Sequence, residues 1–314
     1  MKIADRSFAH RIDLTSLQLF VAVCETGSIG RAAEREFIAA SAVSKRLADL
    51  EAALDTTLLY RHARGVNLTP AGHSLLHHAR SVLYGLEKMQ GELSEYADGV
   101  RGHVRVHASI SAIVQFLPQD LGTFTRLHPQ VKIDLEEHLS NEVMRAVQEG
   151  AADLGVCNAN APAPGGTPLQ VRPYQHDHLA LIVPATHELA RRTAINFAES
   201  LDFDHVGLHA NSSISLAMHQ TAALAGRAVR LRIRVTGLDA MCRMIDNGLG
   251  IGVMPTQAFH LLRGPSNLRC VPLADAWAVR PISLVARDFD SLPITARSLV
   301  AHLSAMAGAP AASA

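Results

Sequence analysis

Residues 28–64 read SIGRAAEREFIAASAVSKRLADLEAALDTTLLYRHAR, and this stretch predicts two short helices joined by a tight turn. The first helix is expected over Ser28–Phe37 and the second over about Ala40–Leu54. Only Ile38 and Ala39 remain between them, so the two helices must cross at a steep angle. That arrangement is typical of a helix-turn-helix.

The apolar positions of the two helices indicate which sides are buried. The first helix has Ser28 as its N-cap and an expected buried stripe of Ala32, Ala33 and Phe37. The second helix buries apolar residues that recur at steps of 4, 3 and 4, namely Val43, Leu47, Leu50 and Leu54.

The opposite side of the second helix carries small and basic residues, which suits a helix that lies in the major groove of DNA. Short side chains permit close approach, while Lys45 and Arg46 can reach phosphates or guanine edges. The residues expected to contact DNA are Arg31, Ala40, Ser41, Ser44, Lys45, Arg46 and Arg64. The alternative is a helical hairpin inside an ordinary α-helical core.

The residues that follow favour the DNA-binding interpretation. Leu58–Tyr60 predicts a short strand, residues 61–67 a polar turn, and Val66–Leu68 a return strand. A hairpin of this size corresponds to the wing of a winged helix, with Arg61 and Arg64 placed to meet the DNA backbone. Thr69 and Pro70 then cap and begin a new helix.

This part of the chain resembles the DNA-binding domain of LysR-type transcriptional regulators. The matching pieces are LQLFVAVCETGSIGRAAE (17–34), AVSKRLADLEAALDTTLLYR (42–61) and LTPAGHSLL (68–76). The family often has glutamine at the position of Ala40, serine at that of Ala39 and arginine at that of Lys45. These departures imply that base recognition depends more on DNA shape and less on bidentate hydrogen bonds.

The charge of the chain is balanced, with 29 basic and 29 acidic residues. No global positive field therefore marks a nucleic-acid binder. Residues 28–66 are also nearly balanced, with six basic and five acidic side chains: Arg31, Arg35, Lys45, Arg46, Arg61 and Arg64 against Glu34, Glu36, Asp49, Glu51 and Asp55. The electrostatic footprint must be local, with acids on the protein-facing side, or several copies must bind together.

The cellular setting is expected to be cytoplasmic. The first residues, MKIADRSFAHRIDL, lack the apolar region of a signal peptide, and no window of eighteen apolar residues occurs, so no membrane partner is expected. The four cysteines, at 24, 157, 242 and 270, lack CxxC spacing and lie on apolar segments. They predict buried thiols in a reducing compartment, with a redox pair as the alternative.

A long helix is expected over residues 69–97, and its apolar residues predict a coiled-coil seam. They recur at alternating steps of 4 and 3: Leu75, Ala79, Val82, Leu86, Met89, Leu93 and Tyr96. The alternative is a helix packed on its own domain. A seam would pair two recognition helices over an inverted repeat, in a homodimer or a dimer of dimers, which is a homotetramer. His73 and His77 have metal-ligand spacing, but no carboxylate or cysteine completes a ligand set.

After a glycine-containing break at residues 98–102, strands and helices alternate. This rhythm predicts a mostly parallel sheet with helices on both faces. A Pro- and Gly-rich break at residues 158–168 separates two such units. The region resembles the effector-binding domain of the same family, most clearly in MCRMIDNGLGIGVMP (241–255), and this resemblance implies a two-lobed fold like that of periplasmic binding proteins.

The resulting fold class is α/β with an α-rich N-terminal winged helix-turn-helix, a long linker helix and a two-lobed effector domain. The expected domains are the winged helix (1–68), the linker or dimerisation helix (69–98), the effector domain (99–306) and a disordered tail (307–314). Within the effector domain, the first lobe is expected at about 103–160 and 267–306, and the second at about 165–265.

The glycines at 248, 250 and 252 permit a rival interpretation as a dinucleotide-phosphate loop. That motif needs a strand before it and a helix after it. Here the predicted order is reversed, so a helix C-cap and a turn into a strand are favoured, and no cofactor is expected.

Polar residues at the ends of the predicted strands point to a ligand pocket, since ligands bind at the carboxyl ends of strands in such sheets. The expected effector-binding residues are Ser109, Ser111, Asn158, His209, Asn211, Ser212, Thr236 and Gly237. For each of them the alternative is a simple helix cap. Their chemistry suggests a small carboxylate or another polar metabolite.

These observations predict a LysR-type transcription regulator, not an enzyme, that binds double-stranded DNA and responds to a small-molecule effector. Neither GxSxG nor HExxH occurs in the chain. RNA polymerase is a further candidate partner. The alternatives are a solute-binding or enzymatic α/β protein with an unrelated helical extension, and an architectural DNA-binding protein that has no ligand response.

Overall fold

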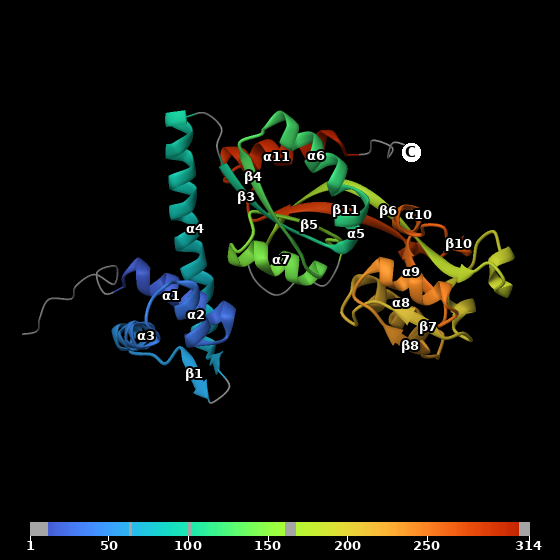
Figure 1. The fold of residues 1–314 in the computed structure, drawn as a ribbon, viewed down its shortest axis with the longest axis horizontal. Helices are drawn as coiled ribbons and strands as arrows, with labels where there is room; N and C mark the ends of the chain where they lie inside the picture. Colours follow the sequence, from blue (N-terminus) through green and yellow to red (C-terminus); the bar gives the residue numbers. More distant parts are fainter. Residues whose placement is uncertain (1–11, 63–64, 99–101, 161–167, 308–314) are drawn as a thin grey trace, which may run out of the picture. The chain divides into compact units, whose positions relative to one another are not determined.

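The computed structural model describes residues 12–62, 65–98, 102–160 and 168–307 (Figure 1). The chain divides between Ala97 and Asp98 into two compact units, which are described separately. The predicted disordered tail, residues 307–314, lies outside the described residues except for Ala307.

The first unit is a winged helix-turn-helix whose elements are α1 (Leu14–Thr26), α2 (Ile29–Arg35), α3 (Ala40–Leu54), β1 (Leu59–His62), β2 (Gly65–Leu68) and α4 (Pro70–Asp98). Asp13 caps α1 by accepting a 2.8 Å hydrogen bond from the Ser16 amide, and Gly27 ends it with a φ of 64°. Phe20, Val43 and Leu47, each at most 1% exposed, anchor the core between the three helices. The predicted bounds of α3 are confirmed.

The expected burial of Phe37 was wrong. Helix α2 ends at Arg35, and Phe37 has a φ of 56° and is 95% exposed. A left-handed residue at this point reverses the chain direction, so the Phe37 side chain leaves the stripe that Ala32 and Ala33 continue into the core.

Helix α4 begins as predicted, with the Thr69 hydroxyl accepting a 2.9 Å hydrogen bond from the Gly72 amide. The predicted seam divides between two environments. Leu75 packs against the winged-helix core and Ala79 is buried, whereas Val82 and Met89 are 47% and 52% exposed. Leu93 and Tyr96 lie where the side chains are not described. The first part of the stripe therefore packs within the chain, and the exposed part starts at Val82.

The second unit contains two lobes, and the first is built on the parallel strands β4 (Val131–Glu137), β3 (Gly102–Ala108) and β5 (Leu154–Cys157). Figure 1 shows α6 and α11 over one face of this sheet and α7 over the other. The helices of this lobe are α5 (Ile110–Gln115), α6 (Leu117–Leu127), α7 (Ser140–Glu149) and α11 (Ile294–Ala305). The predicted parallel unit is confirmed for these three strands.

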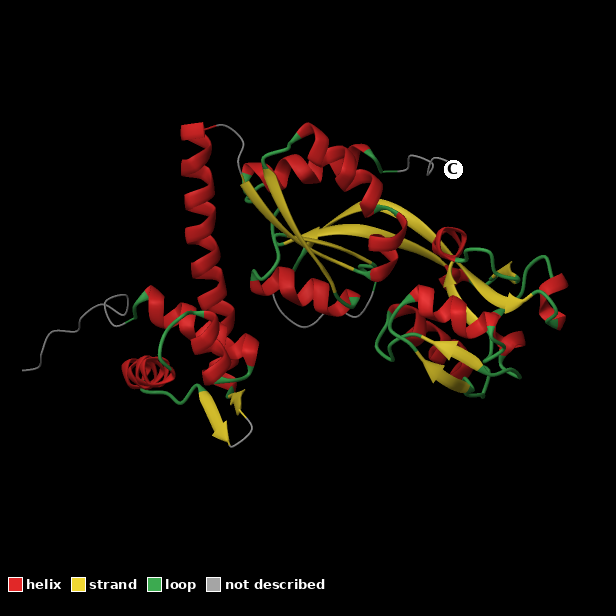
Figure 2. Ribbon diagram, in the orientation of Figure 1, coloured by secondary structure: helices red, strands yellow, loops and turns green. Residues whose placement is uncertain are grey.

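Two long strands, β6 (Gln170–Pro184) and β11 (Val279–Ala286), run from the first lobe into the second (Figure 2). They pair antiparallel with each other, and β11 pairs antiparallel with β5. Tyr174 of β6 belongs to the core of the first lobe, while Leu179–Val183 of the same strand belong to the core of the second. The large sheet is therefore mixed rather than mostly parallel, because the chain crosses between the lobes on these strands.

The second lobe completes its sheet with β9 (Gly252–Pro255) and β10 (Leu268–Pro272), both antiparallel to β6. Its remaining elements are the parallel pair β7 (His205–Gly207) and β8 (Leu231–Arg234), and helices α8 (Ser213–Leu224), α9 (Leu238–Asp246) and α10 (Thr256–Leu262). The expected return to the first lobe at residue 267 is too early. Leu268 and Val271 lie in the core of the second lobe, and the chain crosses back only through β11.

The glycine-rich turn after α9 has the predicted role of a helix end that leads into a strand. Gly248 has a φ of 75° and Gly250 a φ of 145°, and a Cβ on Gly250 would lie 2.5 Å from the Asp204 carbonyl oxygen. Only glycine combines this backbone conformation with this close approach.

The four cysteines are free thiols, of which Cys157 and Cys242 are buried and the other two half-buried. Burial raises the pKa of Cys157 to about 12 and that of Cys242 to about 11, which keeps both thiols protonated. Within the described residues, no helix is long and apolar enough to cross a membrane.

We expect the buried His205 to make the second lobe sensitive to acid. Burial lowers the pKa of His205 to about 4, below its ordinary value of 6.5, so the unfolded chain takes up the proton first as the pH falls. Stability is then full above about pH 6.5 and falls toward pH 4. As the pH falls from about 7 to about 5, His205 should lower the free energy of unfolding by about 2 kcal/mol.

Urea unfolding of the full chain, followed through its single tryptophan, Trp277, measures this loss because Trp277 packs against Phe197 beside His205. His205→Asn should reduce the pH dependence by that amount, whereas His260→Asn, at an exposed site, should leave it unchanged. An equal pH dependence in the wild type and His205→Asn would contradict the prediction.

Candidate functional site

The exposed side of α3 forms the candidate DNA-binding surface. Val43, Leu47 and Leu50 are buried, which turns the predicted contact residues outward. Of these contact residues, Ala40, Ser41, Lys45 and Arg46 are exposed and Ser44 is half-buried. The residue before the helix, Ala39, makes no side-chain cap, so the first-turn N–H groups of α3 lack a side-chain acceptor and are suited to an anion such as a phosphate.

The basic residues of this surface differ in how they are engaged. Arg46 forms an exposed 3.2 Å ion pair with Asp13, and the Arg31 guanidinium donates to the Thr26 carbonyl oxygen. In the part of the chain that the structure describes, Lys45 makes no ion pair. Arg64 lies outside the described residues. Lys45 is therefore the cation most available to a phosphate.

One acid of the balanced stretch is turned into the protein, as the charge argument requires. The Glu51 carboxylate accepts hydrogen bonds from the Leu58 and Leu59 amides at 2.8 and 3.1 Å and pairs with Arg61 at 3.2 Å. The Glu51 carboxylate therefore stabilises the first residues of the wing, and its charge is paired with that of Arg61. Glu34, Asp49 and Asp55 are exposed, so the inward placement does not extend to every acid.

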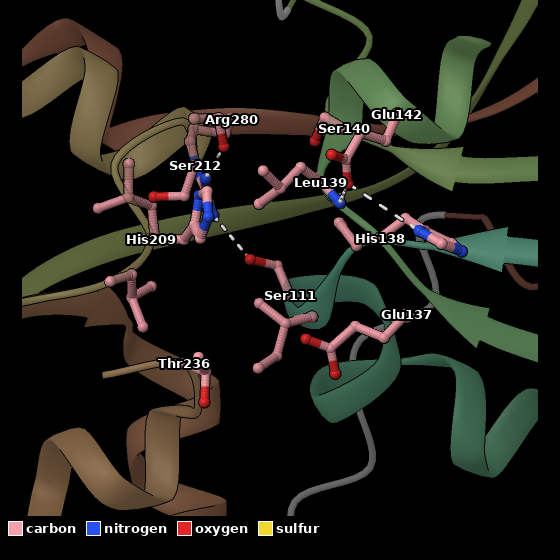
Figure 3. A pocket seen from close by; sticks show the side chains of 15 residues that line it. Ser111, Glu137, His138, Leu139, Ser140, Glu142, His209, Ser212, Thr236 and Arg280 are labelled. Atoms are coloured by element: carbon pink, nitrogen blue, oxygen red, sulfur yellow. Dashed lines mark hydrogen bonds and ion pairs between the residues drawn. The ribbon is translucent and has the colours of Figure 1, made fainter. Parts of the chain in front are cut away.

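The second candidate site is a pocket of about 240 Å³ between the two lobes. Figure 3 shows residues of the first lobe facing residues of the second across it. The polar residues that line it are Ser109, Ser111, Glu137, His138, Ser140, Glu142, His209, Ser212, Ser213, Thr236 and Arg280. A volume of this size suits a small metabolite.

Arg280 occupies the junction of the lobes and is held by a buried ion pair. It lies on β11 directly opposite Asp177 of β6, and the two residues are 5% and 1% exposed. The guanidinium binds the carboxylate through two hydrogen bonds: Nε donates to Oδ1 at 2.8 Å, and Nη2 donates to Oδ2. Such a bidentate pair satisfies both charges without solvent.

The same guanidinium contacts a hydroxyl from each lobe. Nη2 donates to Ser111 Oγ of the first lobe at 3.1 Å, and Nη1 donates to Ser213 Oγ of the second at 2.9 Å. Arginine has five N–H donors, and these four hydrogen bonds use four of them. One Nη1 N–H is left without an acceptor among the described residues. Each serine accepts from Arg280 and keeps its own O–H to donate. The pocket therefore offers donors from both lobes to an acceptor group of a ligand.

The structure places five of the eight predicted effector-binding residues along this pocket, namely Ser109, Ser111, His209, Ser212 and Thr236. Ser109 Oγ is buried and has no hydrogen-bond partner among the described residues, as expected of a group that awaits a ligand or water. Ser212 also caps α8, because its Oγ accepts from the Ser215 amide at 3.1 Å.

The other three predicted residues are not among those that line the pocket. Asn158 is buried and accepts from the Asn160 amide, while the Asn211 amide donates to His209 Nδ1. Gly237 is the N-cap residue of α9. These residues have local roles in their own turns, in agreement with the helix-cap alternative for Gly237.

Sequence reasoning missed Arg280, Asp177 and the acidic rim formed by Glu137 and Glu142. Each of the first two is a charged residue inside an apolar strand, in HDHLALIV (176–183) and VRPISLVA (279–286). Two opposite charges in strands that would otherwise be buried are a usable signal, because such charges must be paired. The pairing itself is a long-range contact that no local pattern reports.

Two family profiles match the chain. The profile "LysR substrate binding domain" matches residues 97–308, and "Bacterial regulatory helix-turn-helix protein, lysR family" matches residues 14–73. A relative described as "Probable RuBisCO transcriptional regulator" of Trichormus variabilis is 26% identical over 275 residues, which cover 87% of this chain and 82% of the relative.

Two solved structures share the fold. Full-length CbnR in complex with its target DNA has a TM-score of 0.64 at 21% identity, over 94% of this chain and 100% of that chain. The regulatory domain of Synechocystis CcmR in complex with 2-PG has a TM-score of 0.60 at 20% identity, over 67% of this chain and 99% of that chain.

We expect Arg280→Met to destabilise the second unit strongly, because it leaves the Asp177 carboxylate buried without its partner. The expected loss is about 3–5 kcal/mol, measured by urea unfolding through Trp277 fluorescence. The double variant Arg280→Met with Asp177→Leu should recover most of this loss, since it removes both charges.

Arg269→Met is the matched control, because Arg269 lies exposed on β10 of the same sheet. Its effect should be within about 0.5 kcal/mol. Equal unfolding free energies for Arg280→Met and Arg269→Met would show that the Arg280–Asp177 ion pair does not stabilise the second unit.

Proposed function

Because this chain belongs to the LysR family, it is a LysR-type transcription regulator with an effector-binding domain, and we propose that a small molecule bound between the two lobes modulates how its copies bind DNA. The family match covers both the helix-turn-helix and the two-lobed domain. The alternative of an unrelated helical extension on a solute-binding or enzymatic protein is therefore disfavoured.

The observation that carries the effector proposal is the Arg280 network. One guanidinium, held by Asp177, reaches hydroxyls from both lobes at the edge of one pocket. A ligand that binds there contacts both lobes at once and favours the lobe arrangement in which those contacts are made. Binding shifts a conformational equilibrium only through such a difference in affinity.

The effector that this pocket fits best is a small carboxylate. Four donors are suited to carboxylate oxygens: the Ser111 and Ser213 hydroxyls, and the Arg280 N–H and Ser109 hydroxyl that have no partner among the described residues. Glu137 and Glu142 also line the pocket and disfavour a large negative charge. The regulatory domain of CcmR, which shares this fold, forms a complex with 2-PG, and this supports a small-molecule effector.

For DNA, the proposal places α3 in the major groove, with its N-terminal turn and Lys45 at phosphates and base edges. The predicted contacts at Arg31, Ala40, Ser41, Ser44, Arg46 and Arg64 are part of this proposal. CbnR, which shares this fold, forms a complex with its target DNA, and this supports DNA binding by the present chain.

The proposed assembly is a homodimer or a dimer of dimers that reads an inverted repeat, with RNA polymerase as a further partner. Exposed Val82 and Met89 flank the half-buried Leu86 on α4, at helical steps of 4 and 3. A second copy that covers this stripe would fix the distance between two α3 helices and hence two half-sites.

We expect Lys45→Ala to weaken DNA binding without loss of folding, because Lys45 is exposed and makes no ion pair within the described residues. Binding to the upstream region of the protein's own gene, measured by fluorescence anisotropy from about 50 to 200 mM salt, should weaken about fivefold to tenfold. The slope of affinity against salt should fall by about one per protomer.

Lys132→Ala removes the same charge from β4 of the effector domain, where Lys132 is 72% exposed, and should leave DNA binding unchanged. If the two variants bind equally, α3 is not the DNA-reading helix.

A thermal-shift screen of small carboxylates against the full-length chain tests the effector class. A binding carboxylate should lose about fivefold in affinity in Thr236→Val, which removes one pocket hydroxyl at constant shape. Thr125→Val is the control, because the Thr125 hydroxyl bonds its own helix at the Leu121 carbonyl. The proposal fails if no carboxylate shifts the melting temperature, or if both variants bind it as the wild type does.

A further inference from the structure

Two histidines and a glutamate meet at the carboxyl ends of β3 and β4. The parallel register pairs His107 of β3 with Glu136 of β4, so their side chains share one face of the sheet. His138 follows Glu136 by two residues and returns to the same face. The Glu136 Oε2 atom lies 3.0 Å from His138 Nε2 and 3.6 Å from His107 Nε2.

We propose that His107, Glu136 and His138 bind a divalent transition metal ion, with Zn²⁺ as the best fit. Zinc bonds to imidazole nitrogen and carboxylate oxygen are about 2.0–2.2 Å long, which puts neighbouring ligand atoms of a tetrahedral site about 3.3–3.6 Å apart. The two distances to Glu136 Oε2 lie close to that range. Two imidazoles and one carboxylate form a set typical of zinc with a fourth position left open.

The third ligand distance requires only a local adjustment. Potential ligand atoms of all three residues lie within 4.8 Å of one another, and the two imidazole rings stack with centroids 4.5 Å apart. The Glu136 side chain is 63% exposed and that of His138 35% exposed, so both can shift toward an ion. His107, which is 8% exposed, is the fixed ligand around which they close.

The His107 ring nitrogen on the other side from Glu136 has no protein partner within the described structure. His107 Nδ1 is buried and has no hydrogen-bond partner among the described residues, which is an unfavourable state for a ring nitrogen.

The surroundings of the cluster complement a dication. The Glu142 carboxylate of α7 lies 3.9 Å from His138 Nδ1, where it can orient the ring from behind once Nε2 coordinates. The nearby cation, Arg105, is paired with Asp153 at 3.1 Å. The Glu136 and Glu142 carboxylates carry two negative charges, which a divalent ion neutralises.

This site is distinct from the pocket between the lobes. His107 and Glu136 do not line that pocket, and Figure 3 shows the His138 ring on the Glu142 side, pointing away from Arg280. His138 and Glu142 contribute to both sites, whereas His107 and Glu136 belong to the metal site alone. Metal binding is therefore tested without reference to any effector or DNA.

The experiment uses untagged full-length protein, stripped with a chelator and titrated with Zn²⁺ against a chromophoric competitor. We expect one tight site per chain. Glu136→Gln and His138→Gln should each weaken it about tenfold or more, and Co²⁺ in the same site should show the visible absorption of tetrahedral coordination.

His103→Gln is the matched control, since His103 also sits on β3 and pairs with a carboxylate, Asp134, but has no second histidine beside it. It should bind Zn²⁺ as the wild type does. Circular dichroism establishes that each variant is folded. The absence of a stoichiometric site in the wild type, or equal Zn²⁺ affinity in His138→Gln and the wild type, overturns the proposal.

Discussion

The effector domain depends on one buried ion pair, Arg280 with Asp177. Strands β6 and β11 are the long strands that run through both lobes. The Arg280–Asp177 ion pair joins these two strands at the point where they pass from one lobe to the other. A buried charge is tolerated only when it is paired and fully hydrogen-bonded, so the two strands must keep this register. The remaining guanidinium donors then fall at the pocket, beside Ser111 and Ser213. In the function we propose, the ion pair that joins these two strands also supplies the group that recognises the effector.

The balanced charge of the DNA-binding unit is resolved by where its acids lie. Glu51 holds the first residues of the wing and neutralises Arg61, so this acid does not oppose DNA at the groove. Arg46 is already paired with Asp13. Few free cations remain on α3, and a single copy is expected to bind weakly. Pairing of two copies through α4 would combine the binding free energies of two half-sites and so raise the overall affinity.

Local patterns predicted much of the fold. The apolar spacing in α3, the threonine and proline at the start of α4 and the glycine turn after α9 act over a few residues, and each agrees with the structure. Phe37 was placed in the core because the helical period continued through it. The backbone takes a left-handed conformation there instead, with a φ of 56° at Phe37, and the apolar period does not report such a reversal.

The pocket was predictable only in part, because its parts come from distant segments. Serines and threonines at strand ends can be recognised from their position in the sequence, and Ser111 and Thr236 do line the pocket. Asp177 and Arg280 are 103 residues apart and become partners only through strand pairing. The cluster of His107 and His138 has the same origin, since adjacent parallel strands bring it together.

The most direct test of the account is a nuclease footprint of the full-length protein on the region upstream of its own gene, recorded with and without a carboxylate that binds it. We expect a protected inverted repeat whose extent, or whose pattern of enhanced cleavage, changes when the carboxylate is added. A region with no protected inverted repeat, or a footprint identical in both conditions, would contradict it.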